Sequence, residues 1–122
     1  MEANELRIGN YLNQNIDNIP NHFIQFKVGE IVQGSEFLKT ASPIPLTEEW
    51  LLKFGFDYIR NINEYHNRKI NEGAYYLKPV GDVYDHWYLY HKTKMITSNI
   101  QHVHQLQNLY FVLTGEELTL IK

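Results

Sequence analysis

The sequence predicts an α+β fold, in which a small curved antiparallel sheet carries one short and one long helix. Residues 47–54 and 98–114 have apolar side chains at helical spacing between start and stop signals. Most of the remaining chain consists of short apolar runs separated by turn residues, which is typical of strands. The 122 residues suit one domain, 1–122, that buries roughly two thirds of the surface of its unfolded chain.

The first forty residues are expected to form short strands. Residues 6–8 and 11–12 flank a Gly-Asn turn pair, and apolar residues alternate with polar ones over 24–28. Residues 35–39 would return as a further strand. So many short strands joined by tight turns favour a strongly bent sheet that resembles an SH3-like barrel.

The short helix has clear signals at both ends. Thr47 suits the N-cap, Glu48 and Glu49 lie in the first turn, Lys53 lies in the last turn, and Gly55 supplies a left-handed stop. Its large apolar side chains share one side and would anchor the helix on the sheet: Trp50, Leu51 and Phe54.

Further strands are predicted at 56–62, 74–78 and 83–91, with a final strand at 118–121. Between them, the pattern predicts the long helix over 98–114. Ser98 and Gln101 fit a capping box and Gly115 fits the stop. Its apolar positions cover about half of the circumference, so the helix should pack deeply on a sheet or be buried on two sides. The side expected to face water carries Gln101, His104, Gln105 and Asn108.

Composition and charge exclude several classes of protein. The chain has no cysteine, so disulfides, thiolate metal sites and thiol nucleophiles are absent, and a reducing cytoplasm fits. The acidic, polar start lacks the features of a secretory signal, and no apolar run approaches the length of a membrane span. A net charge of -3 disfavours nonspecific binding to DNA.

Catalytic and metal-binding motifs are not visible. His102 and His104 form a His-x-His pair, but on the predicted helix the two imidazoles would point about 160° apart. The three serines lie outside any nucleophile elbow, and no Gly-rich run precedes a helix. We therefore expect a noncatalytic protein without metal or cofactor.

One strand face stands out as a candidate binding surface. Successive side chains of a strand alternate between faces, so 83–91 should place four ring side chains in a row: Tyr84, His86, Tyr88 and Tyr90. Such a row could form the centre of a protein interface or stack on bases. The structural alternative is a half-buried sheet face covered by the long helix.

Three strings resemble a group of small uncharacterised phage- and prophage-associated proteins of Bacteroidetes. They are ELRIGN at 5–10, PIPLTEEWLLKFGF at 43–56 and HVHQLQNLYFVLTGEEL at 102–118. The resemblance implies a phage-linked cytoplasmic origin, and it brings no catalytic or binding residues with it.

Three hypotheses follow from the sequence. The first is a noncatalytic phage or prophage accessory protein that binds another protein, or a second copy of itself, through exposed aromatic sheet surface. The alternative is a selective nucleic-acid-binding module that uses the tyrosine face for stacking. A small enzyme with a composite acidic site ranks last.

Overall fold

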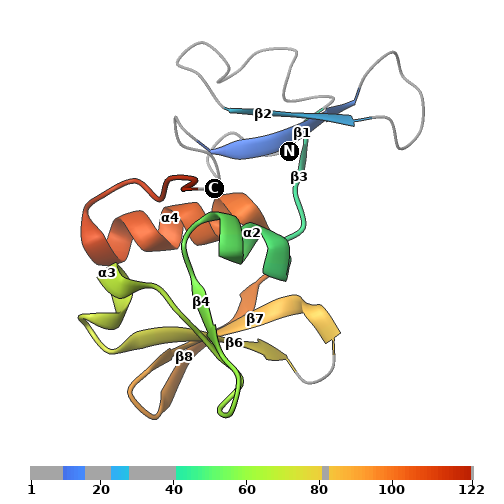
Figure 1. Ribbon diagram of the computed structural model, residues 1–122. Coiled ribbons are helices and arrows are strands. Elements are labelled where there is room, and N and C mark those ends of the chain that lie inside the picture. The colour runs from blue at the N-terminus through green and yellow to red at the C-terminus, as the bar shows by residue number, and fades with distance from the viewer. Residues whose placement is uncertain (1–9, 16–22, 28–40, 81–82, 122) are drawn as a thin grey trace.

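The fold is α+β, with two antiparallel sheets on opposite sides of the long helix α4, Val103–Thr114 (Figure 1). The computed structural model describes residues 10–15, 23–27, 41–80 and 83–121. The smaller sheet has the strand order β2-β1-β3 and the larger one the order β4-β5-β6-β7-β8. No helix within these residues is long and apolar enough to cross a membrane.

The smaller sheet contains β1 (Tyr11–Asn15), β2 (Phe23–Lys27) and β3 (Ala41–Pro43). β1 and β2 confirm the strands predicted at 11–12 and 24–28, whereas the predicted strands at 6–8 and 35–39 lie outside the described residues. The three strands form an open sheet, so an SH3-like barrel is not what the described strands build. After Pro43, the chain leaves the sheet for a helix instead of continuing around a barrel.

The predicted short helix is confirmed as α2, Glu48–Lys53. The Thr47 hydroxyl accepts the Trp50 N–H at 3.5 Å, and Gly55 takes the left-handed conformation with φ of 89°. The rings of Trp50 and Phe54 also contact the Tyr11 ring, at centroid distances of 5.7 and 6.3 Å. The helix therefore packs against the smaller sheet as well as the larger one.

The larger sheet contains five strands in sequence order: β4 (Asp57–Ile59), β5 (Glu64–His66), β6 (Tyr75–Val80), β7 (Val83–His91) and β8 (Lys94–Ile100). β7 has the predicted bounds, and β4 is shorter than predicted. Sequence reasoning missed β5, β8 and the single-turn helix α3, Arg68–Asn71. Asn67 does have the local role expected of an asparagine, because its side chain accepts the Lys69 N–H and caps α3.

The long helix starts five residues later than predicted. Residues 98–100 belong to β8, where Ile100 pairs with Trp87, and the predicted cap at Ser98 is wrong. The N-cap is His102, and the Gln105 side chain accepts the backbone N–H groups of Gln101 and His102 at 2.8 and 3.0 Å. A helix that began at Ser98 would remove the last residues of β8 from the sheet.

Helix α4 is buried on two sides. Its Val103, Leu106 and Tyr110 side chains join the core on the larger sheet, together with Trp87 and Leu89. The side predicted to face water is covered instead: His104 is 2% exposed, and the prediction that it faces solvent is wrong. The smaller sheet lies over that side of the helix, so of the two expected outcomes burial on two sides is the one observed (Figure 1).

Polar side chains join α4 to the start of β1. The Gln107 side-chain oxygen accepts the Tyr11 N–H at 2.8 Å, and the Asn10 amide donates to Asn108 at 2.9 Å. Gln107 is 1% exposed and Asn10 is fully buried. These hydrogen bonds satisfy polar groups that would otherwise be costly to bury between the helix and the sheet.

The residues after α4 do not form the predicted strand at 118–121. Leu118 is buried in the core, and the Ile121 N–H donates to the Lys53 carbonyl at the end of α2. A single hydrogen bond to a helix end does not make a strand pair, so this segment is an irregular tail that packs beside α2.

Candidate binding surface

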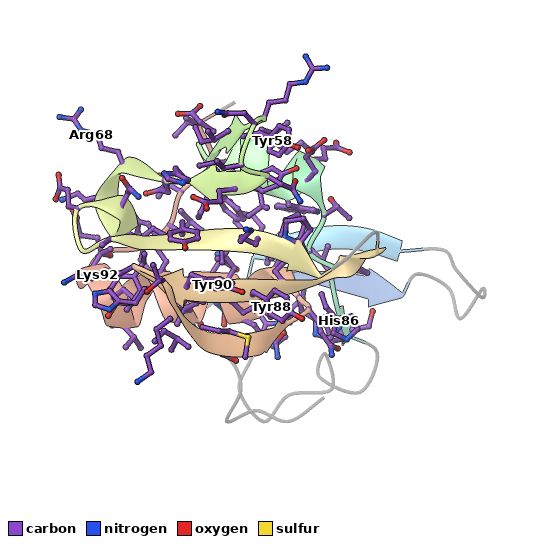
Figure 2. All side chains as sticks on the ribbon, turned by 90° about the horizontal axis from the view of Figure 1, so that it is seen from below. Tyr58, Arg68, His86, Tyr88, Tyr90 and Lys92 are labelled. Atoms are coloured by element: carbon purple, nitrogen blue, oxygen red, sulfur yellow. The ribbon has the colours of Figure 1, made fainter. Side chains whose placement is uncertain are left out.

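The larger sheet has one face toward the helices and one face that no described element covers. Along β7, Trp87 and Leu89 point into the core and are 0% and 1% exposed. His86, Tyr88 and Tyr90 alternate with them, and Figure 2 shows these three following one another along β7 on the side away from α4. The alternative in which α4 covers the tyrosine face is therefore wrong, because α4 packs on the Trp87 side.

Strand register shows which side chains share this surface, called the open face below. Tyr76 lies opposite Tyr90 and Lys78 lies opposite Tyr88. Together the registers define two rows across the sheet. The first row contains Asp57, His66, Tyr76, Tyr90 and Met95, and the second contains Ile59, Glu64, Lys78 and Tyr88.

The rings of the first row stack on one another. His66 lies parallel to Tyr76 within 18° at a centroid distance of 5.6 Å, and Tyr76 lies parallel to Tyr90 within 10° at 5.4 Å. Tyr88 meets Tyr90 edge-on at 6.0 Å. This His66–Tyr76–Tyr90 stack spans β5, β6 and β7. His66 contacts one face of the Tyr76 ring and Tyr90 contacts the other.

Hydrogen bonds hold His66 and Tyr76, two members of the stack, in place. The His66 imidazole lies 2.8 Å from the Glu64 carboxylate and 3.1 Å from the Asn71 amide, one at each ring nitrogen. The Tyr76 hydroxyl donates to the Lys92 carbonyl at 2.5 Å. Burial raises the pKa of the Tyr76 hydroxyl above its ordinary value, and Glu64 and Tyr90 add to the shift. Tyr76 therefore stays neutral at physiological pH.

Of the four side chains predicted to form the binding surface, the structure describes three. His86 lies on β7 beyond Tyr88, at the end of the row away from Tyr90, and its Nε2 is 2.8 Å from the Gln101 amide. Tyr88 and Tyr90 are half-buried on the open face. The Tyr84 side chain lies outside the described residues. Tyr76 and His66 were missed because only the pairing of β5, β6 and β7 brings them beside Tyr90.

Positive charge and exposed aliphatic surface lie beside the rings. The Lys78 ammonium lies 5.9 Å from the centre of the Tyr90 ring, whereas Lys94 pairs with His91 and so belongs to the helix side of the sheet. Beyond Tyr90, the edge strand β8 exposes Met95 at 48% and Ile96 at 52%. The open face thus has an aromatic centre, with Lys78 and the exposed Met95 beside it.

Within the described residues, no three His, Asp or Glu side chains gather as a metal site requires. A shallow pocket of about 200 Å³ lies beside α3 and the C-terminal tail. Its Lys69 is ion-paired with Glu116 at 2.6 Å, and this carboxylate raises the Lys69 pKa. A lysine held in its charged form is a poor nucleophile or base.

Comparison with protein-family models, with curated proteins and with solved structures finds no match to this chain.

Proposed function

We propose that this chain is a noncatalytic phage or prophage accessory protein that acts in the cytoplasm by binding another protein through its open face. The observation that carries the proposal is the stripe of half-buried Tyr88, Tyr90 and Tyr76 on a sheet face with no described element over it. Tyrosine is enriched in protein interfaces because it offers a large apolar ring together with a hydroxyl that can hydrogen-bond. The resemblance of three strings to phage-associated proteins supports the phage link.

The ring arrangement favours a protein partner over stacked bases. A base stacks on the face of an aromatic ring. Both faces of Tyr76 are already in contact with His66 and Tyr90, so this ring presents only its edge outward, while its hydroxyl donates to the Lys92 carbonyl. Tyr90 also has one face against Tyr76. Edges and hydroxyls suit the mixed apolar and polar contacts of a protein interface better than they suit base stacking.

The proposal can be tested by retention of host proteins on the immobilised chain, followed by sedimentation of the purified chain to detect self-association. The test variant is Tyr88→Ser, because Tyr88 lies outside the His66–Tyr76–Tyr90 stack and its loss should leave the fold intact. The control is Tyr58→Ser. Tyr58 is 40% exposed, but it pairs with the buried Tyr65 and therefore lies on the opposite face of the sheet from Tyr88. Circular dichroism and thermal unfolding check that each variant is folded.

We expect the wild type and the Tyr58 variant to retain the same protein, or to self-associate equally, and the Tyr88 variant to lose at least about tenfold in affinity. Equal binding by all three chains would refute the proposal. If Tyr88→Ser unfolds the chain, Tyr88→Lys is used instead, because it keeps the aliphatic stem over the sheet while placing a charge at the interface. Unchanged binding by that variant would refute the proposal equally.

A further inference from the structure

The open face carries charges of both signs, and their order across the sheet indicates which protein binds there. We propose that the partner is a second copy of this chain, and that two copies pack their open faces together about a two-fold axis. This inference rests on the proposed function, because it names the protein that the open face binds. It follows from the order of the side chains in the second row, which is Ile59, Glu64, Lys78 and Tyr88.

The second row has an acid and a base on neighbouring strands. The register of β5 and β6 places Glu64 beside Lys78, yet within the described residues these two side chains form no ion pair with each other. Oε1 of Glu64 contacts His66 at 2.8 Å, and the Lys78 ammonium lies 5.9 Å from the centre of the Tyr90 ring. The second carboxylate oxygen and the ammonium can therefore each pair with an opposite charge from another copy.

A two-fold axis that runs parallel to the strands, midway between β5 and β6, makes this row complementary to itself. It exchanges β5 with β6 and β4 with β7, so each contact occurs twice, as an interface between identical surfaces requires. Lys78 of each copy then lies over Glu64 of the other, and Ile59 lies over Tyr88. Sheets packed face to face lie about 10 Å apart, a gap that a lysine and a glutamate side chain span together.

Other positions of the axis fit less well. An axis along β5 would bring Glu64 over Glu64, and an axis along β6 would bring Lys78 over Lys78, so like charges would face each other across the interface. An axis between β6 and β7 would move Glu64 away from Lys78. Packed sheets are rotated by about 30° relative to each other, so side chains match best close to the axis. The two charged side chains lie there.

The first row adds no repulsion to this arrangement. The same axis places Asp57 over Tyr90, whose hydroxyl can donate to a carboxylate, and His66 over Tyr76. The match is already present on one chain, whereas a different protein would have to supply it separately. A nucleic acid fits less well, because Asp57 and Glu64 would repel its phosphates.

The experiment measures self-association of the full chain by sedimentation equilibrium. The contact covers about four strands at ~4.8 Å spacing, which is small for a specific interface, so the dimer should be weak and is measured from micromolar to millimolar concentration. The test variants are Glu64→Lys and Lys78→Glu, each alone and mixed in equal amounts. The control is Lys94→Glu, which reverses an exposed charge on the helix side of the sheet, where Lys94 pairs with His91.

We expect the wild type and the Lys94 variant to dimerise equally. Each single reversal on the open face puts like charges in both ion pairs, so Glu64→Lys and Lys78→Glu should each dimerise at least about tenfold more weakly. A mixture of these two variants restores opposite charges in both pairs. Its dimerisation should therefore lie within about threefold of the wild type.

Unfolding curves check that each variant is folded. If Glu64→Lys is unfolded, Lys78→Glu carries the test alone, because within the described residues Lys78 has no ion pair to lose. Three results would overturn the second copy as partner: a wild type that stays monomeric at millimolar concentration, a dimer that neither reversal weakens, or a mixture that stays monomeric.

The proposed function is decided by a separate result. If the wild type retains a host protein and Tyr88→Ser loses it, the protein-binding face stands even where the second copy is overturned. If the chain neither self-associates nor retains a host protein, both proposals are overturned.

Discussion

Gln107 provides the sharpest test of how the two sheets are joined through α4. It is 1% exposed, and its side-chain oxygen accepts the Tyr11 N–H at 2.8 Å and lies 3.5 Å from the Asn10 amide nitrogen. Replacing it with leucine keeps the volume of the side chain but removes the acceptor. The Gln107→Leu variant should therefore lose stability because a hydrogen bond is lost, and not because a cavity forms.

The expected loss can be estimated from these contacts. Removing the partner of a buried donor costs about 1–3 kcal/mol, because the donor loses its hydrogen bond without regaining water. The contact with Tyr11 has ideal length, whereas the contact with Asn10 is at the limit for a hydrogen bond and adds little. The free energy of unfolding should thus fall by about 1–3 kcal/mol.

Urea unfolding measures this change, and amide hydrogen exchange locates it. In the variant, the Tyr11 N–H should exchange faster than in the wild type, while amides of β7 change only with global stability. Val112→Ala is the control, because Val112 lies on the same helix and is 79% exposed. It should shift stability by less than about 0.5 kcal/mol. If Gln107→Leu is as stable as the wild type, the hydrogen bond does not hold β1 to α4.

Three further predictions concern backbone strain and ionisation. Gly55→Ala should cost about 1–2 kcal/mol in chemical unfolding, because φ is 89°, whereas the exposed Ile121 side chain can move away from the new methyl. Ala74→Gly should raise stability by about 0.5–1 kcal/mol in the same assay, because Ala74 has φ of 66°; a loss would contradict this strain. Burial and Glu116 raise the Tyr110 pKa above 10.0, so above that pH the unfolded chain ionises first and stability falls. Tyr110→Phe should flatten this alkaline decline, measured by unfolding on both sides of pH 10, and an unchanged slope would argue against it.

Local patterns predicted some elements well because the pattern was long or because recognisable residues stood at both of its ends. β7 alternates over nine residues, and α2 has recognisable residues at both ends. The start of α4 was wrong because Ser98 and Gln101 imitate a capping box, whereas Ile100 is needed opposite Trp87 in the sheet. β5 and α3 are too short to show any periodicity. Their existence depends on tertiary contacts, such as the burial of Tyr65 and Ile70.

The candidate surface could be predicted only along one strand. Alternation on β7 identified the Tyr88 and Tyr90 face, but the neighbours that complete it come from β5 and β6 through strand register. The wrong assignment of His104 has a similar cause. The sequence allowed burial of α4 on two sides, but His104 looks like a solvent-facing residue until a second sheet covers it. Both failures arise from pairings between residues distant in sequence.

The His66–Tyr76–Tyr90 stack has a consequence for the thermodynamics of recognition. Side chains that are anchored before an encounter have little rotational freedom left to lose, so the entropic penalty of association is small. Three strands supply these rings, hydrogen bonds with Glu64 and Asn71 fix His66 at one end, and the hydrogen bond to the Lys92 carbonyl fixes the central Tyr76. A ligand would meet a stiff, preassembled platform, and even a modest contact area could then give useful affinity.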